Sequence, residues 1–162
     1  MQARKLKPEE RYYSGLHMAV AFEGGFDLLK ERAAAREAKE DPRADCWAAF
    51  LENQPMPVAS FIMNKYRSRF DGHIVKMGGV GGVATLPAHR RGGAIRACMQ
   101  ASFRELYDSG FVLSSLYPFS AAYYRKFGFE NGQPCHLWTL PLSDLNVPDV
   151  GGKVTELFPG DD

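Results

Sequence analysis

Residues 83–96, VATLPAHRRGGAIR, join a predicted strand to a predicted helix through a turn that is rich in glycine and arginine. The helix is predicted because Ile95, Met99, Phe103 and Leu106 are spaced to line one face, with an end near Gly110. The first turn of a helix offers unpaired backbone N–H groups and a partial positive charge, and glycine lets an anion approach the backbone closely. Arginines in the same turn add charge-assisted hydrogen bonds. The stretch therefore predicts a phosphate-binding turn rather than a plain solvated one.

The elements before this turn are predicted from hydrophobic spacing and from turn residues. An amphipathic helix is expected at residues 8–22, and after a Gly-Gly step a second helix, rich in Ala, Leu, Glu, Lys and Arg, is expected from Asp27 to about residue 40. Three strands are expected at residues 47–51, 58–66 and 74–85, and a polar link at residues 67–72 contains an Asp-Gly turn. Strands that follow one another this closely favour an antiparallel meander.

The elements after the turn complete the predicted sheet. A short buried strand at residues 111–116 is followed by a small helix at residues 120–126 and by a last strand or hairpin that ends near Leu140. A meander followed by a strand–helix–strand crossover predicts an α/β (α+β) fold, with a mixed, mostly antiparallel sheet and helices on both faces. Residues 1–142 are predicted to form this domain. Residues 143–162 are predicted to be a linker or the start of a further domain.

The composition is that of one ordinary globular domain of 162 residues, with 45% hydrophobic and 24% charged residues. A formal net charge of +1 gives no general attraction to nucleic acid or to an anionic membrane, so any anion site has to be local. The three cysteines are far apart and predict neither disulfides nor zinc, and Cys98 is expected in the core. No apolar run reaches the ~20 residues of a membrane span. These observations predict a cytoplasmic protein that binds neither nucleic acid nor membrane.

Two segments resemble the GNAT superfamily of N-acetyltransferases. The turn is similar to the superfamily's coenzyme A motif, Arg/Gln-x-x-Gly-x-Gly/Ala: Arg90 and Gly93 match, whereas Ile95 departs at the last position. An aliphatic residue there, together with the Pro-x-His-Arg-Arg lead-in, resembles the enhanced intracellular survival branch. Residues 116–129, LYPFSAAYYRKFGF, are similar to the Tyr-Pro-Phe and Tyr-Arg-Lys-Phe-Gly segments of the same branch. The resemblance implies the GNAT fold over most of the chain.

The resemblance also implies acetyl-CoA as the co-substrate and a set of site residues. The backbone of Val83, Ala84 and Thr85 is expected to pair with the pantetheine arm, and Ser120 is expected to join the coenzyme site. The pyrophosphate is expected at Arg90, Arg91, Gly92, Gly93, Ala94, Ile95 and Arg96. Tyr124 is the expected general acid, because a tyrosine hydroxyl with an ordinary pKa near 10 can protonate a departing thiolate. Tyr123, next to it, is the rival.

The acceptor is expected to be a primary amine of a small molecule or a peptide, which attacks acetyl-CoA directly in a ternary complex. Glu23 and Asp27 are the candidate substrate-binding residues, because the superfamily forms its acceptor site at the break between the first two helices. The plain alternative is a helix cap and a solvated charge. No general base stands out. In longer members of the branch the base is the C-terminal carboxylate of a separate domain, so further C-terminal domains are an open expectation, as is a homo-oligomer.

Two other functions compete with an acetyltransferase. The first is a coenzyme A-binding module without catalysis of its own, within a larger protein. The second is a nicotinamide enzyme, because residues 79–84, GVGGVA, fit the dinucleotide fingerprint Gly-x-Gly-x-x-Gly/Ala. Against the second, Pro87 follows too soon for a helix to open there. The four histidines lack the spacing of metal ligands, so no metal is expected.

Overall fold

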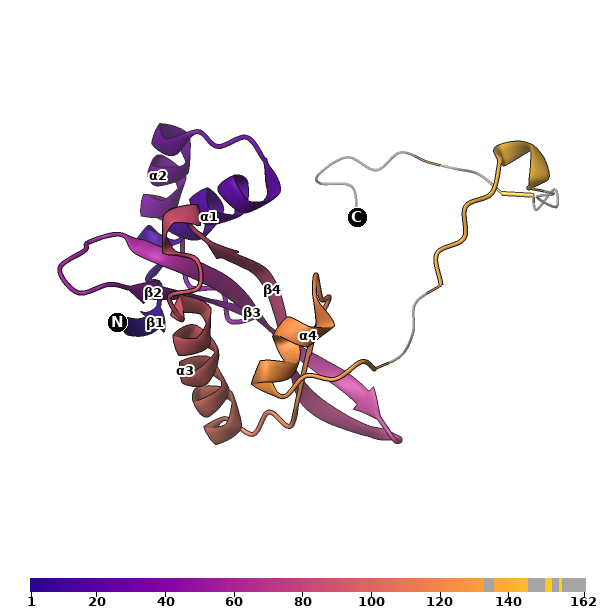
Figure 1. The fold of residues 1–162 in the computed structure, drawn as a ribbon. Coiled ribbons are helices and arrows are strands. Elements are labelled where there is room, and N and C mark those ends of the chain that lie inside the picture. The colour runs from indigo at the N-terminus through magenta and orange to yellow at the C-terminus, as the bar shows by residue number, and fades with distance from the viewer. Residues whose placement is uncertain (133–135, 146–150, 153–154, 156–162) are drawn as a thin grey trace. The chain divides into compact units, whose positions relative to one another are not determined.

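The computed structural model describes residues 1–132, 136–145, 151–152 and 155, and it divides the chain into two compact units, Met1–Glu130 and Asn131–Asp162. A five-stranded sheet runs through the first unit (Figure 1). The strands lie side by side in sequence order, with the first four antiparallel and the last two parallel, as predicted for a mixed sheet. They are β1 (Gln2–Lys5), β2 (Ala44–Phe50), β3 (Pro57–Phe70), β4 (His73–Thr85) and β5 (Leu113–Leu116).

Helices cover both faces of the sheet, as predicted. The helix between β4 and β5 packs on one face, and the first helix packs on the other. Alternation along β2 separates the faces, because Trp47 and Ala49 belong to one core cluster while Ala48 and Phe50 belong to the other. The helices are α1 (Tyr12–Phe22), α2 (Leu28–Glu37), α3 (Ala94–Asp108) and α4 (Ala121–Tyr124), and the shorter helical turns are η1 (Pro8–Glu10), η2 (Pro87–His89) and η3 (Arg125–Phe127).

The larger core lies between α3 and the sheet. Phe61 and Met63 of β3 and Met99 of α3 are 0% exposed. The predicted apolar face of α3 is confirmed, since Ile95 and Leu106 are also buried there. Each fully buried side chain of this size contributes about 1.5–3 kcal/mol to folding. This interface therefore holds the first turn of α3 firmly against the end of β4.

The N-terminal strand β1 was not predicted. It pairs antiparallel with β2, although its sequence shows no apolar alternation. Its cations have local partners: Arg4 donates to both carboxylate oxygens of Glu10 at 2.6 and 2.8 Å and lies 4.2 Å from the centre of the Phe50 ring. Lys5 forms an ion pair with Asp45 at 3.1 Å. Ladder hydrogen bonds and ion pairs stabilise this strand, so hydrophobic periodicity could not reveal it.

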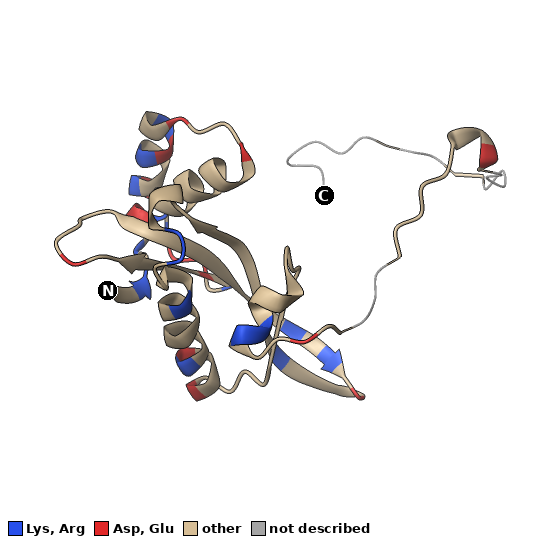
Figure 2. Cartoon of the chain, viewed as in Figure 1, with Lys and Arg blue, Asp and Glu red and all other residues tan. Residues whose placement is uncertain are grey.

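The hairpin of β3 and β4 is longer than predicted. The predicted polar link at residues 67–72 is wrong, because β3 continues to Phe70, which pairs with His73. Asp71 and Gly72 alone make the turn, with the positive φ angles of 46° and 78° that a two-residue hairpin turn requires. Figure 2 marks Lys and Arg positions in blue along this hairpin. These polar residues concealed the strand, because the end of the hairpin is largely exposed on both faces.

The second unit contains one short helical turn among its described residues, η4 (Leu142–Asp144). The last strand or hairpin predicted after Phe129 is not formed by residues 129–132 or 136–140, and residues 133–135 lie outside the described residues. Most of residues 143–162 also lie outside them. The predicted domain boundary after residue 142 therefore stays a prediction.

A buried histidine ties α1 to the sheet. His17 is 1% exposed; its Nδ1 lies 2.8 Å from the Ser60 hydroxyl, and its Nε2 lies 2.9 Å from the carbonyl oxygen of Pro57. A carbonyl oxygen only accepts, so Nε2 carries the proton and Nδ1 accepts from Ser60. Burial lowers the pKa of His17, because the charged form loses its hydration. The folded chain therefore holds His17 in the neutral form.

The free energy of unfolding is expected to fall as the pH drops below about 6.5, the ordinary pKa of histidine, because the unfolded chain then binds a proton that the folded chain resists. His17→Gln should reduce this acid dependence and destabilise the chain by about 1–3 kcal/mol at pH 7.5, since it disrupts two buried hydrogen bonds. Urea denaturation at pH 7.5 and 5.5 measures both effects. His73→Gln, at the exposed hairpin turn, is the matched control, and an undiminished acid dependence in His17→Gln would contradict the prediction.

Candidate functional site

The glycine- and arginine-rich turn lies at the N-terminus of α3, as predicted. Arg91 and Gly93 have positive φ angles of 65° and 82°, so the chain bends sharply before the helix begins at Ala94. No described side chain caps this helix. The first N–H groups of α3 have no partner within the helix and carry the positive end of its dipole. The turn therefore offers backbone donors to an anion, with the exposed side chains of Arg90 and Arg96 beside them.

A β-bulge in β4 lies just before this turn. Ile62 of β3 pairs with Gly81 and Ser60 pairs with Ala84, so β4 has one extra residue in this interval. Gly82 has a φ of 59°, and a Cβ atom there would lie 2.8 Å from the sulfur of Met18. Glycine inside a strand is typical of such a bulge. The bulge also excludes a side chain from this point of the strand.

The end of β4 has one free edge. The parallel pairing with β5 stops at Val80 and Leu116, whereas β4 continues to Thr85 and pairs on its other side with β3. Along residues 81–85 no described strand lies on the β5 side. Outward-facing backbone groups of this segment can therefore bond to an extended ligand, as they would to another strand.

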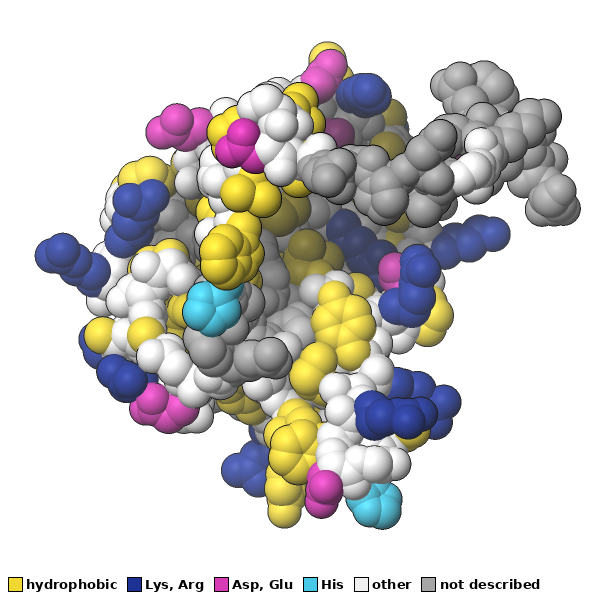
Figure 3. Space-filling view, turned by 90° about the vertical axis from the view of Figure 1, so that its right-hand side faces the viewer, with side chains coloured by type: hydrophobic (Ala, Val, Ile, Leu, Met, Phe, Trp, Pro, Cys, Tyr) yellow, Lys and Arg dark blue, Asp and Glu magenta, His cyan; other side chains and the backbone are white. Residues whose placement is uncertain are grey.

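A cleft of about 870 Å³ opens beside the turn and the free edge. Among the described residues, its lining includes four cations and no carboxylate. Figure 3 faces the right-hand side of Figure 1 and shows hydrophobic side chains exposed there, with Lys and Arg side chains among them. The lining residues are Ala21, Phe22, Val83, Ala84, Thr85, His89, Arg90, Arg91, Gly93, Ala94, Ile95, Arg96, Phe119, Tyr123, Lys126 and Phe127.

The structure thus brings nine of the expected coenzyme residues to one cleft. Two do not line it. Gly92 lies in the turn outside the lining, and Ser120 caps α4, where its hydroxyl accepts from the backbone N–H of Tyr123 at 3.3 Å. Arg96 lies with its guanidinium carbon 5.4 Å from the centre of the Phe127 ring, which orients this cation at the cleft.

The two tyrosines of α4 have different surroundings. Tyr123 lines the cleft, whereas Tyr124 is 3% exposed and packs against the rings of Phe119 and Phe129, with centroid distances of 5.4 and 6.1 Å. Burial, and to a lesser degree the neighbouring Tyr123, raises the pKa of Tyr124 to about 12. Burial also raises the pKa of Tyr123, while Arg96 opposes that shift. Both hydroxyls are therefore protonated at neutral pH and can donate.

The two expected acceptor carboxylates lie in the loop between α1 and α2 and do not line the cleft. Asp27 is the N-cap of α2, and its Oδ1 accepts from the backbone N–H groups of Leu29 and Lys30 at 3.0 and 3.1 Å. Glu23 ends α1 with a positive φ of 56°, and its side chain is exposed. Glu23 directly follows Phe22, which does line the cleft.

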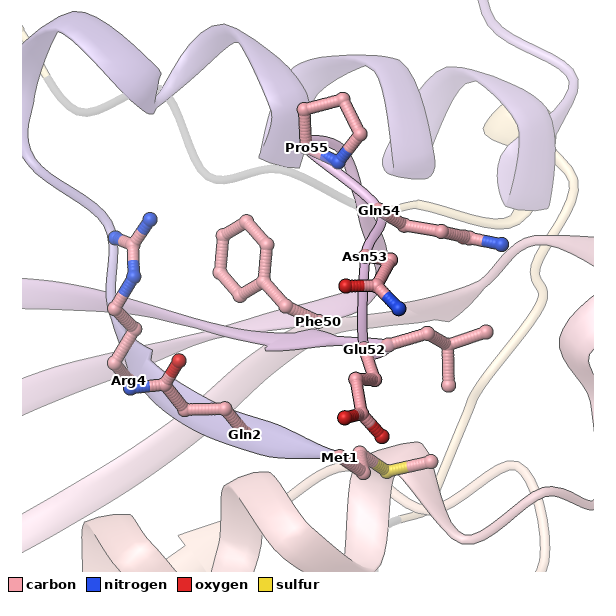
Figure 4. A pocket seen from close by; sticks show the side chains of 9 residues that line it. Met1, Gln2, Arg4, Phe50, Glu52, Asn53, Gln54 and Pro55 are labelled. Carbon is pink, nitrogen blue, oxygen red and sulfur yellow. The ribbon is translucent and has the colours of Figure 1, made fainter.

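A second hollow, of about 670 Å³, lies beside β1 and the turn between β2 and β3. Figure 4 shows Arg4 on one side of Phe50 and Asn53, Gln54 and Pro55 on the other. The charge of Arg4 is already paired with Glu10 at 2.6 Å, and no helix begins at this hollow. It lacks the anion-binding features of the cleft.

One further observation bears on the nicotinamide alternative. The fingerprint-like residues 79–84 lie inside β4 and open no helix, so they lack the strand-to-helix turn that a dinucleotide site needs.

Cys98 is 0% exposed in the core, as predicted, and burial raises its pKa to about 12. Within the described ranges, no group of His, Cys, Asp and Glu is placed to hold a metal ion, and no helix there has the length and apolar character to cross a bilayer.

Sequence reasoning missed several lining residues. Phe22 carries no signal beyond its place before a glycine pair, since an exposed aromatic at a helix end has no distinctive pattern. Phe119, Lys126 and Phe127 belong to the segment that resembles a known branch, but nothing in their spacing assigned them to a site. The chain brings them to the cleft only because α4 folds back beside the end of β4.

Comparison with known proteins gives a family match and a fold match. The family model described as an acetyltransferase (GNAT) domain matches residues 3–132. Among the curated proteins no sequence matches the chain. A conserved protein from Enterococcus faecalis V583, described as a probable N-acyltransferase, is 24% identical with a TM-score of 0.66 over 80% of this chain and 32% of that one. The chain thus spans about a third of that protein's length.

Other similar structures are matched over nearly their whole length. An acetyltransferase from Trypanosoma brucei is 16% identical, with a TM-score of 0.68 over 86% of this chain and 99% of that one. Glucosamine-6-phosphate N-acetyltransferase from Arabidopsis thaliana is 12% identical, with a TM-score of 0.67 over 86% and 98%. At such identities the likeness establishes the fold alone.

Proposed function

We propose, because this chain belongs to the acetyltransferase (GNAT) domain family, that it transfers an acetyl group from acetyl-CoA to a primary amine. The observation that carries the proposal is the cleft, whose cations surround an uncapped helix N-terminus beside a free strand edge. An anionic coenzyme with an extended amide-containing arm matches both features. We also propose that the chain belongs to the enhanced intracellular survival branch, because residues 116–129 resemble the segments of that branch.

The pyrophosphate would bind at the first N–H groups of α3, with Arg90, Arg91 and Arg96 adding charge-assisted bonds. The amides of the pantetheine arm would bond to the backbone of Val83 and Thr85 along the free edge of β4. The arm would run past the bulge at Gly82, and the thioester would lie toward α4. Gly92 and Ser120 would then act by shaping the turn and by capping α4.

The reaction is a direct acyl transfer. The neutral amine nitrogen attacks the thioester carbonyl carbon, a C–N bond forms, the C–S bond breaks, and the electron pair leaves on sulfur. Tyr124 protonates this thiolate, and the surplus proton of the amine passes to water. A covalent intermediate at Cys98 is not favoured, because Cys98 is buried and its raised pKa keeps the thiol protonated. Glu23 would attract the ammonium form of the acceptor at the rim.

A coenzyme A-binding module without turnover is the second candidate function. One observation favours it: the Tyr124 side chain is buried and does not line the cleft. Such a module could serve within a longer protein, given the coverage of about a third of the Enterococcus faecalis protein. The two candidates share the coenzyme site and differ in whether an acetyl group leaves it.

Acetyl-CoA is expected to raise the melting temperature of the chain, since a ligand at 100 times its Kd stabilises by about 2.7 kcal/mol. NAD should have no effect, and ATP controls for binding of any polyanion. Thiol release from acetyl-CoA with a panel of primary amines then tests the transfer. A response to NAD alone would rule out the coenzyme assignment, whereas stabilisation by acetyl-CoA without thiol release would support the binding module.

A further inference from the structure

The part of the cleft beside α1 is apolar. Ala21 and Phe22 line it from the end of α1, and Phe119 and Tyr123 face it from the α4 side. Phe22 is 66% exposed and Phe119 is 75% exposed. Exposed aromatic surface at the wall of a cleft remains in contact with water until a ligand covers it. This region therefore offers stacking and hydrophobic contact to a bound molecule.

The cations of the cleft come from elements other than α1. Arg90, Arg91 and Arg96 come from the turn before and within the start of α3, and Lys126 comes from η3. Arg96 lies over the Phe127 ring, and its charge also acts on Tyr123. The pyrophosphate and the 3′-phosphate of the coenzyme would neutralise these cations. None of the lining residues described is a carboxylate, so the cleft has no negative group left for an acceptor.

This arrangement bears on the number of charges that an acceptor can carry. A polyamine or an aminoglycoside has several ammonium groups, each of which loses hydration on binding and needs an anionic partner. In the loop between α1 and α2, Asp27 already accepts two backbone N–H groups, and the side chain of Glu23 is exposed. Neither carboxylate lines the cleft. Ammonium groups beyond the reacting amine would therefore find no anionic partner among the described lining residues.

We propose that the acceptor is a monoamine with an aromatic or branched aliphatic body, which packs against Phe22 and Phe119 while its single amino group meets the thioester. The proposal deepens the proposed acetyl transfer and rests on it. The aromatic walls select the body, and the scarcity of carboxylates selects against polycations. Phe22 is thus a specificity-determining residue on α1.

The test compares acceptors at saturating acetyl-CoA. The kcat/KM for 2-phenylethylamine is expected to exceed that for spermidine and for ethanolamine at least tenfold, because covering a phenyl ring is worth about that factor. Phe22→Ala should lower kcat/KM for 2-phenylethylamine about tenfold, mainly through KM, and should reduce the ratio of the 2-phenylethylamine value to the ethanolamine value. Phe70→Ala, a substitution of an exposed phenylalanine at the far hairpin, is the matched control and should change neither value.

Calorimetry of the same amines with the CoA-bound chain gives a readout that does not depend on turnover. Tighter binding of 2-phenylethylamine that Phe22→Ala weakens supports the proposal. A preference for spermidine, with thiol release intact, overturns the acceptor class but not acetyl transfer. Absence of thiol release with every amine overturns acetyl transfer, and absence of amine binding as well overturns both. A dimer that Phe22→Ala dissociates would show that a second copy covers the apolar wall, which also overturns the proposal.

Discussion

Tyr124→Phe is expected to lower kcat for acetyl transfer by about 10²–10⁴-fold, the usual contribution of a positioned general acid. The substitution removes only the hydroxyl, and the ring contacts with Phe119 and Phe129 remain, so the fold should be retained. The KM for acetyl-CoA should change little, because the hydroxyl acts on the departing thiolate. Steady-state thiol release with one amine measures both constants.

The pH dependence gives a second readout of the same residue. A general acid must be protonated to act, and burial raises the pKa of Tyr124 to about 12. No loss of kcat through this group is therefore expected between pH 7 and 10. A fall of kcat with a midpoint in that range, absent from Tyr124→Phe, would mean that the hydroxyl is not held in its protonated form.

The two neighbouring tyrosines make the experiment decisive. Tyr107→Phe, on the exposed side of α3, is the matched control and should leave kcat unchanged. If Tyr123→Phe lowers kcat strongly and Tyr124→Phe does not, the acid is the tyrosine that lines the cleft. If neither variant lowers kcat, another group protonates the departing thiolate.

The helix α3 was predicted well from the sequence, because its apolar residues recur at a regular helical spacing. The 15-residue α3 has a single apolar face, and its buried Ile95, Met99 and Leu106 recur at helical spacing. The turn before it was predicted as well, because a glycine pair between a strand and a helix marks a turn; its binding of an anion stays a prediction. Both signals are local, and the structure places them side by side.

The parts that escaped prediction depend on partners distant in sequence. β1 forms because Gln2–Lys5 pair with Trp47–Phe50 of β2. The end of β3 forms because a two-residue turn brings the start of β4 alongside it. Neither segment carries an apolar alternation. In the site, the burial of Tyr124 and the approach of Phe22 likewise result from how α4 and α1 pack. A motif can identify such residues as important without revealing which of them faces the ligand.

The double variant Arg90→Ala with Arg96→Ala is expected to weaken acetyl-CoA binding by about two orders of magnitude or more. A hydrogen bond to a charged group contributes about 1.5–3 kcal/mol. Both arginine side chains are exposed, so salt screens them and the contribution of each should lie near the lower value. Isothermal calorimetry at low salt and at 0.5 M NaCl measures the loss. The salt dependence of Kd should be weaker in the variant, since fewer charges contact the phosphates.

A change of two charges could by itself alter affinity for any anion, so the control must match it. Arg67→Ala with Arg69→Ala removes the same charge from the exposed β3–β4 hairpin, outside the cleft lining. This control should bind acetyl-CoA with an unchanged Kd. Equal losses in the two double variants would show that the chain attracts the coenzyme only through its general charge. A loss confined to Arg90 and Arg96 would instead locate the phosphates at the turn before α3, where backbone N–H groups can bind them as well.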